Sequence, residues 1–320
     1  MDKYLGSMCT GTTVYAARDI KLTETETKYS VEGIVAISET VTTLRDGRTI
    51  RKRDTRRAQR YDRMRYFIES YGCTMNFGEG RMLSEEMAAL GYEEVPSPEE
   101  ADIVILNTCT VVGTTEKRMM DRIADLKRLG KEVVVTGCLA AAQPKRVMIR
   151  LPDAPVISPR GYEGFGKMIA DRYGVAGPPR TLPVRKDAIL PIAQGCLGNC
   201  TYCITKIARG NLASYAPEAL KREFDRMVAG GASEILVTAQ DTACYGRDIG
   251  TTLPELLSSF LENGGDFRIR IGMMNPNALL PVCDGLLDVM EDPRVYRFLH
   301  IPVQSGSDAV LGRMNRRYTA

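Results

Sequence analysis

From residue 65 onward, short apolar runs alternate with amphipathic stretches, and this alternation predicts strands and helices in turn. Residues 66–70, 102–106 and 132–136 have the apolar and β-branched character of short buried strands. Helical spacing of apolar residues covers 82–90 and a stretch that ends near Leu129. Strands that alternate with helices in this way predict an α/β fold in which the N-terminal domain is a doubly wound parallel sheet.

A second series of strand and helix pairs begins near residue 188. Predicted strands cover residues 189–193, 234–238, 267–271 and 298–303, and predicted helices lie near residues 217–228, 254–261 and 279–290. Repeated units of this kind are typical of a (β/α) barrel or of part of one. Because four such strands are recognisable before Ala320, we expect an incomplete, partial barrel.

The first 63 residues show no clear core pattern. Asp46-Gly47 favours a tight hairpin turn between short strands. We therefore divide the chain into four parts. They are a basic N-terminal extension that is partly disordered or a small β element (1–63), a parallel-sheet domain (64–175), a linker with Gly and Pro (176–187) and a partial barrel (188–320).

Composition places the chain among ordinary globular proteins, with 320 residues of which 44% are hydrophobic and 26% charged. No apolar run reaches the roughly 18 residues that a membrane helix requires. The first residues lack the basic and apolar pattern of a secretory signal. These features favour a cytoplasmic location and no membrane partner.

The net charge of +3 conceals a strongly basic segment. Residues 45–65 contain ten Lys and Arg against three Asp. The densest part of this segment consists of Arg51, Lys52, Arg53, Arg56 and Arg57. Two interpretations stay open: an arm that binds RNA through phosphate contacts, and a solvated basic helix or disordered arm without a ligand.

Nine cysteines in a chain without an export signal indicate metal or redox chemistry, because a reducing compartment keeps thiols free. Cys196, Cys200 and Cys203 have the spacing C-x3-C-x2-C directly after a predicted strand. Three thiolates on one loop can bind three irons of a [4Fe–4S] cluster and leave the fourth iron for another ligand. A structural zinc site usually requires a fourth protein ligand, and no second C-x2-C pair supplies one.

Cys73, Cys109 and Cys138 each follow the C-terminal end of a predicted strand in the first domain. The carboxyl ends of parallel strands meet at one edge of the sheet, so these thiolates are predicted to meet and hold a second cluster. Taken singly, each would more often be an inert buried cysteine. The remaining cysteines lack such an arrangement and are interpreted as structural: Cys9, Cys244 and Cys283.

Together, the three scattered cysteines and the C-x3-C-x2-C loop resemble the radical S-adenosylmethionine (SAM) methylthiotransferase family, from about residue 66 to 319. Residues 201–215, 245–251 and 299–305 are most similar to its archaeal and eukaryotic branch. That branch converts N6-threonylcarbamoyladenosine at position 37 of tRNA to its 2-methylthio derivative. The resemblance implies SAM and two [4Fe–4S] clusters as cofactors. In the family, one SAM methylates a sulfur carried on the auxiliary cluster, and a second SAM yields the radical that lets the methylthio group replace hydrogen.

The resemblance also suggests SAM contacts and partners, but it assigns no catalytic side chain. The candidate SAM-binding residues follow the cysteine loop or lie on or after later strands: Tyr202, Gln240, Asp241, Arg270 and Gln304. For each of them, a satisfied interior polar residue remains the alternative. Expected partners are the anticodon loop of tRNA and an electron donor such as a ferredoxin or flavodoxin.

Two further residues have open interpretations. Arg209, just after the cysteine loop, is interpreted either as a contact to phosphate or SAM or as a surface arginine. His300, the single histidine, is predicted to be an interior hydrogen-bonded residue rather than a catalytic base.

Family members carry a six-unit partial barrel followed by an RNA-binding TRAM domain. Two strands and that domain are therefore expected to be missing here, and a separate chain that completes the barrel is one expectation. Three alternatives to the main function stay open: a truncated inactive or split paralogue acting as an RNA-binding or regulatory module, a methylthiotransferase for isopentenyladenosine in tRNA, and one for an aspartate of a ribosomal protein. Residues 205–215 disfavour the last two.

Overall fold

The computed structural model describes residues 11–12, 22–32, 35–44, 49–57, 64–111 and 113–320, and up to residue 57 it describes the backbone alone. The chain divides into two units. One consists of Met1–Arg63 with Ala176–Pro178, and the other of Met64–Val175 with Pro179–Ala320.

The first unit contains an antiparallel sheet of order β1-β2-β3-β4. Its strands are β1 (Gly11–Thr12), β2 (Leu22–Glu32), β3 (Val35–Leu44) and β4 (Thr49–Arg57). The predicted turn at Asp46-Gly47 lies outside the described residues, although β3 and β4 pair on either side of it.

The basic run lies in β4, so its interpretation as a helix is wrong. Every residue from Thr49 to Arg57 is opposite a residue of β3, and this pairing holds the backbone extended. The side chains of the five basic residues lie outside the described part of the structure, and their RNA-binding role stays a prediction. They are Arg51, Lys52, Arg53, Arg56 and Arg57.

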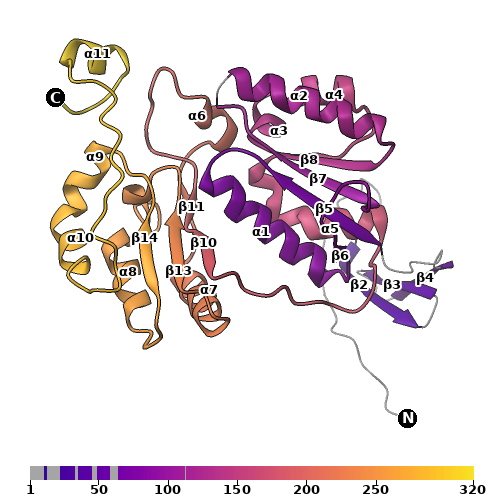
Figure 1. The fold of residues 1–320 in the computed structure, drawn as a ribbon. Helices are drawn as coiled ribbons and strands as arrows, with labels where there is room; N and C mark the ends of the chain where they lie inside the picture. The colour runs from indigo at the N-terminus through magenta and orange to yellow at the C-terminus, as the bar shows by residue number, and fades with distance from the viewer. Residues whose placement is uncertain (1–10, 13–21, 33–34, 45–48, 58–63, 112) are drawn as a thin grey trace. The chain divides into compact units, whose positions relative to one another are not determined.

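The second unit begins with a parallel sheet of order β6-β5-β7-β8-β9 (Figure 1). Its strands are β5 (Arg65–Ser70), β6 (Glu93–Glu94), β7 (Ile103–Thr108), β8 (Glu132–Gly137) and β9 (Val156–Ile157). Every residue of the central strand β7 is buried, as a parallel strand covered on both faces requires. The predicted parallel-sheet fold is confirmed.

Helices cover both faces of this sheet (Figure 1). They are α1 (Thr74–Ala89), α2 (Gly113–Arg128), α3 (Cys138–Ala142), α4 (Pro144–Arg150), the 3-10 helix η1 (Pro159–Gly164) and α5 (Phe165–Tyr173). On one face, Met119 and Ile123 of α2 pack with Val104 and Val133 of the strands. Helix α1 begins well before the predicted start at residue 82, because polar residues in its first turns are buried and interrupt the apolar spacing.

A second parallel sheet has the order β10-β13-β14, with β10 (Asp187–Pro191), β13 (Glu234–Thr238) and β14 (Arg268–Ile271). The helices that alternate with these strands are α7 (Pro217–Ala229), α8 (Leu253–Leu261), α9 (Pro276–Leu279), η3 (Leu280–Val282) and α10 (Cys283–Val289). Among the described residues this sheet has open edges and does not close into a barrel, in agreement with the predicted partial barrel.

The predicted strand at residues 298–303 is absent from the described structure. A single bridge between Ile269 and Val295 continues the sheet beyond β14. Phe298 and Val303 remain 48% and 61% exposed, so this run lacks the packing that would favour an extended strand.

The remaining elements surround the cysteine loop or follow the sheet. They are β11 (Ala193–Gln194), α6 (Ile204–Arg209), β12 (Ala213–Ser214), η2 (Thr242–Cys244) and α11 (Asp308–Arg313). Strands β11 and β12 pair antiparallel and bracket the loop that contains Cys196, Cys200 and Cys203. Within the described part of the chain, no helix combines the length and the apolar character needed to cross a membrane.

Helix α1 packs directly against the second sheet. A Cβ atom added at Gly78 would lie 2.8 Å from Cγ of Pro191 and 2.9 Å from Cγ2 of Ile189, so glycine allows a close approach to β10. The hydroxyl oxygens of Thr74 and Thr238 are 3.1 Å apart and share a hydrogen bond. Because α1 starts just after Cys73, these contacts connect the segment that follows Cys73 to strands β10 and β13 of the second sheet.

Phe224 is the aromatic centre of the second core. Its ring stacks on Phe260 with centroids 4.4 Å apart and meets the edge of Phe267 at 5.0 Å. We expect Phe224→Ala to lower the free energy of unfolding by about 3–5 kcal/mol, because it leaves a cavity among fully buried rings. Urea denaturation measures this loss. The control Phe298→Ala, at an exposed ring, should cost no more than about 1 kcal/mol, and equal losses would contradict this description of the core.

Candidate functional site

The three scattered cysteines meet at one edge of the first sheet. Cys73, Cys109 and Cys138 follow the carboxyl ends of β5, β7 and β8, which are adjacent in the sheet. The Sγ atoms of Cys73 and Cys138 lie 3.8 and 3.9 Å from the same atom, Oδ1 of Asn76. Cys109 and Cys138 are buried and Cys73 is exposed. The predicted convergence is therefore present in the geometry.

Two glycines allow this close approach. Gly72 has φ +111°, and a Cβ atom there would lie 2.8 Å from Cβ and 2.9 Å from Sγ of Cys109. Gly137 has φ +86°, and a Cβ atom there would lie 2.3 Å from the carbonyl oxygen of Thr108. A larger residue at either position would push neighbouring cysteine segments apart, and positive φ also disfavours a side chain.

A buried polar network lies against Cys138. Arg209 of α6 donates from Nε to Sγ of Cys138 at 3.3 Å and from Nη2 to Oδ1 of Asn76 at 2.6 Å, while Nη1 pairs with Glu79. Arg209 is 1% exposed, so its interpretation as a surface arginine is wrong. Its donors are directed at side chains of the first domain. Because Arg209 is buried, an RNA phosphate cannot reach it.

The electrostatics of this network act on Cys138 in two opposing directions. Burial raises the pKa of the Cys138 thiol, and the neighbouring Arg209 guanidinium opposes that rise. Burial also raises the pKa of Glu79, again opposed by Arg209. Since the thiolate is the form that binds metal, Arg209 acts in favour of metal binding by Cys138.

The other trio lies on the loop between β11 and α6. A Cβ atom added at Gly198 would lie 3.3 Å from Sγ of Cys196 and 3.6 Å from Sγ of Cys200, so these two sulfurs flank one glycine. The amide of Cys203 donates to the carbonyl oxygen of Cys200 at 3.2 Å, and Cys203 is the N-cap residue of α6, without a capping hydrogen bond from its side chain. All three cysteines are partly exposed.

Cys244 lies beside this loop, a position that the sequence did not predict. The adjacent Cys244 thiol lowers the pKa of Cys196 against the effect of burial, and the amide of Gly198, 3.1 Å from Sγ of Cys196, acts in the same direction. Sγ of Cys244 is also 3.1 Å from Oδ2 of Asp241. No spacing relative to the other cysteines signalled Cys244, because it comes from η2 in another βα unit.

Two candidate SAM-binding residues, which follow the end of β13, adjoin the cysteine loop. Oε1 of Gln240 accepts a hydrogen bond from the amide of Gly195 at 2.6 Å. Asp241 is 4% exposed, and its Oδ1 accepts from the amide of Asn275 at 3.1 Å. Burial raises the pKa of Asp241. Oδ1 of Asn275 is buried without a hydrogen-bond partner in the described structure, so an unused acceptor lies beside this carboxylate.

The other three candidates are more exposed. Tyr202 is 50% exposed, and its hydroxyl accepts a hydrogen bond from Arg316 at 2.5 Å. The Arg270 guanidinium lies 5.4 Å from the ring centre of Phe298. Gln304 is exposed, with φ +66°.

His300 is exposed, so its interpretation as an interior residue is wrong. Its backbone carbonyl accepts a hydrogen bond from the amide of Met274. The run from 298 to 303 does not form the buried strand that would have enclosed the imidazole ring.

The geometry suits a cluster better than a single ion. Within residues 64–111 and 113–320, no three His, Cys, Asp or Glu side chains are grouped to hold one metal ion. Zinc thiolates lie about 2.3 Å from one shared centre. Thiolates of a [4Fe–4S] cube bind different irons and are further apart. Two sulfurs of the first trio share the amide oxygen of Asn76 and two of the second flank Gly198, and this wider spacing fits the larger group.

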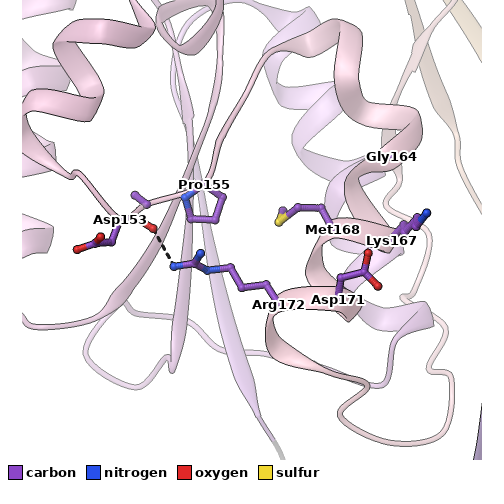
Figure 2. Close-up of a pocket in the computed structure, with 8 residues that line it drawn as sticks. Asp153, Pro155, Gly164, Lys167, Met168, Asp171 and Arg172 are labelled. Atoms are coloured by element: carbon purple, nitrogen blue, oxygen red, sulfur yellow. Dashed lines mark hydrogen bonds between the residues drawn. The ribbon is translucent and has the colours of Figure 1, made fainter. Parts of the chain in front are cut away.

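A separate hollow of about 490 Å³ lies beside α5 (Figure 2). The Arg172 guanidinium crosses it and donates to the carbonyl oxygen of Asp153 at 2.7 Å. Its lining residues include no cysteine and no candidate SAM-binding residue. This hollow is therefore separate from the two trios.

Comparison with known proteins gives two family matches and a set of curated relatives. Residues 65–158 match the family described as Uncharacterized protein family UPF0004, and residues 190–320 match the Radical SAM superfamily. Probable threonylcarbamoyladenosine tRNA methylthiotransferases of Pyrococcus horikoshii and Methanocaldococcus jannaschii are 40% and 41% identical to this chain, over 275 and 267 residues. The threonylcarbamoyladenosine tRNA methylthiotransferase of Drosophila melanogaster is 40% identical over 272 residues.

These matches cover most of this chain but only part of each relative. They span 80% of the chain for both archaeal proteins and 79% for the insect protein. The matched regions make up 64%, 62% and 49% of the three relatives, so the chain spans about half to two-thirds of their length.

A solved structure supports the fold. The radical S-adenosylmethionine methyltransferase TsrM of Kitasatospora setae, with cobalamin and a [4Fe-4S] cluster bound, matches with a TM-score of 0.54 at 12% identity. The match covers 80% of this chain and 65% of that one. The chain thus carries a UPF0004 segment followed by a Radical SAM segment, and over about 80% of its length it is similar to threonylcarbamoyladenosine tRNA methylthiotransferases of archaea and an insect.

Proposed function

We propose that this protein converts N6-threonylcarbamoyladenosine at position 37 of tRNA to its 2-methylthio derivative, with SAM and two [4Fe–4S] clusters. The observation that carries the proposal is the gathering of six cysteines into two trios within one compact unit. The names of the archaeal and insect relatives support the choice of substrate.

The two trios have different proposed roles. Cys196, Cys200 and Cys203 would hold the cluster that binds SAM, and the first-domain trio would hold the auxiliary cluster: Cys73, Cys109 and Cys138. When bound, these groups supply electron transfer to SAM and the sulfur for transfer. The Gly198 amide favours the thiolate of Cys196.

The SAM-binding assignments remain part of the proposal. Asp241 and Gln240 border the cysteine loop and offer oxygen acceptors to the SAM amino group or ribose. Tyr202 offers an exposed ring face to adenine. Arg270 and Gln304 are proposed to reach the SAM carboxylate or ribose from the later part of the barrel.

The proposed partners follow from the reaction. They are the anticodon loop of tRNA and an electron donor such as a ferredoxin or flavodoxin. The basic run in β4 supports tRNA binding through phosphate contacts. We place the reaction in the cytoplasm, where tRNA and low-potential electron donors are found together. The division at residues 63, 175 and 187 also stands as a proposal.

Mass spectrometry of tRNA nucleosides tests the function. We expect cells without this gene to lose the 2-methylthio derivative and to accumulate N6-threonylcarbamoyladenosine. The wild-type gene should restore the product, whereas a Cys200→Ala gene should not, because two thiolates alone would not retain the SAM-binding cluster. Unchanged threonylcarbamoyladenosine products, or a change confined to isopentenyladenosine, would contradict the proposal.

A further inference from the structure

We propose that Arg209 is a positioning residue that raises the reduction potential of the auxiliary cluster through its hydrogen bond to Cys138, and that Glu79 is its counter-charge. This inference rests on the proposed function, because the first-domain trio must hold a cluster.

The guanidinium of Arg209 is fixed in one orientation. Its three nitrogen atoms donate to three different groups: Sγ of Cys138, the carboxylate of Glu79 and Oδ1 of Asn76. The backbone is held as well, because Nε of Arg160 donates to the carbonyl oxygen of Arg209 at 3.2 Å. An arginine held in this way presents a permanent positive charge to one sulfur.

The position of this charge predicts the sign of its effect. Reduction adds one electron to the cluster and its thiolates, and a positive charge hydrogen-bonded to a ligand sulfur stabilises the more negative state. Arg209 is 1% exposed and Glu79 is 0% exposed, so water screens these charges weakly. Arg209 should therefore raise the reduction potential.

Glu79 should have the opposite effect. Its carboxylate pairs with Nη1 of Arg209, whereas a different nitrogen, Nε, donates to the sulfur of Cys138. Its second oxygen, Oε2, is buried and has no hydrogen-bond partner among the described residues. Since Arg209 is the partner of this buried carboxylate, the pair presents its positive end to Cys138 and its negative end away from it.

This network also connects the two cysteine loops. Helix α6, which ends at Arg209, begins at the residue after Cys203. Helix α3, which begins at Cys138, packs against α6. The segment that leaves the C-x3-C-x2-C loop thus carries the charge that acts on the other trio.

Potentiometric titration followed by electron paramagnetic resonance tests the inference on the full-length protein. Cys196, Cys200 and Cys203 are first replaced together by Ala, so that the signal comes from the auxiliary cluster alone. In this background, Arg209→Gln should shift the midpoint potential to a more negative value, and Glu79→Gln should shift it to a more positive value. Arg294→Gln, which removes a partly exposed arginine paired with Asp292, is the control and should leave the midpoint unchanged.

A purely structural role would not give shifts of opposite sign. Shifts in the same direction, or no shift in either variant, would overturn the inference. If Arg209→Gln alone fails to fold, the double variant Arg209→Gln, Glu79→Gln removes both buried charges together and leaves neither one unpaired. Its midpoint should be more negative than that of Glu79→Gln, and equal midpoints would overturn the inference.

The failure of the proposed function gives a different result. If the background protein binds no iron while residues 79 and 209 are still native, the first-domain trio holds no cluster, and the function and the inference fall together. If a cluster forms but its midpoint potential is the same in the background protein, in Arg209→Gln and in Glu79→Gln, the inference alone fails.

Discussion

Replacing Cys138 by Ala is expected to abolish methylthio transfer to tRNA while reductive SAM cleavage continues. Cys138 belongs to the first-domain trio, and the C-x3-C-x2-C loop keeps its three thiolates. Iron should fall from about eight to about four per chain after anaerobic reconstitution. Iron analysis, 5′-deoxyadenosine and 2-methylthio nucleoside measured on one sample check this separation of the two activities.

Two other cysteine variants complete the comparison. Cys200→Ala should lose SAM cleavage as well as transfer, because it removes a ligand of the other proposed cluster. Cys283→Ala, at a partly buried cysteine without an assigned role, should retain both. Methylthio transfer by Cys138→Ala at the wild-type rate would show that the first-domain trio does not supply the sulfur.

Gly137→Ala is expected to remove the auxiliary cluster without touching a cysteine. The new Cβ would lie 2.3 Å from the oxygen and 2.5 Å from the nitrogen of Thr108, both backbone atoms that cannot turn aside. The conformation of Gly137, φ 86° and ψ −163°, is itself restricted to glycine. We expect a loss of about 1–3 kcal/mol in the free energy of unfolding from conformation alone, and a further loss from the collision.

Gly130→Ala is the matched control. Gly130 also has positive φ, at +66°, but an added Cβ would meet no atom within 4 Å. Only the conformational cost of about 1–2 kcal/mol should remain, and the iron content should stay at the wild-type value. Urea denaturation and iron analysis distinguish the two variants, and equal iron content in both would contradict the role of Gly137 in bringing Cys138 beside Thr108.

The sequence alone predicted the parallel sheet, because short apolar runs alternate with helical stretches along this part of the chain. It also predicted that Cys73, Cys109 and Cys138 would share one edge, since the ends of parallel strands are set by topology. Both predictions depend on local patterns and on general rules of sheet geometry, so a single sequence was sufficient.

The polar network around Cys138 could not be predicted from the sequence. Asn76 and Glu79 are three residues apart on α1, which places them on one helix face, but that spacing does not reveal whether the face is buried. Arg209 comes from the second domain and meets them only through tertiary packing. An arginine after a cysteine loop is more often exposed, and burial of this one depends on carboxylate and amide partners far away in sequence.

The errors have related causes. The run at 298–303 is apolar enough for a strand, yet strand formation depends on packing and pairing that only the folded chain reveals. The predicted start of α1 was late because the buried polar residues Asn76 and Glu79 break the apolar period. The basic run became strand β4 because it pairs with the preceding strand β3 in an antiparallel hairpin, and this pairing outweighs the preference of the basic residues themselves.

The central claim is that Cys73, Cys109 and Cys138 hold a cluster of their own. The most direct test counts iron and acid-labile sulfide in protein reconstituted without oxygen, after Cys196, Cys200 and Cys203 have all been replaced by Ala. About four irons and four sulfides per chain are predicted. Protein that is folded but binds no iron would contradict the claim.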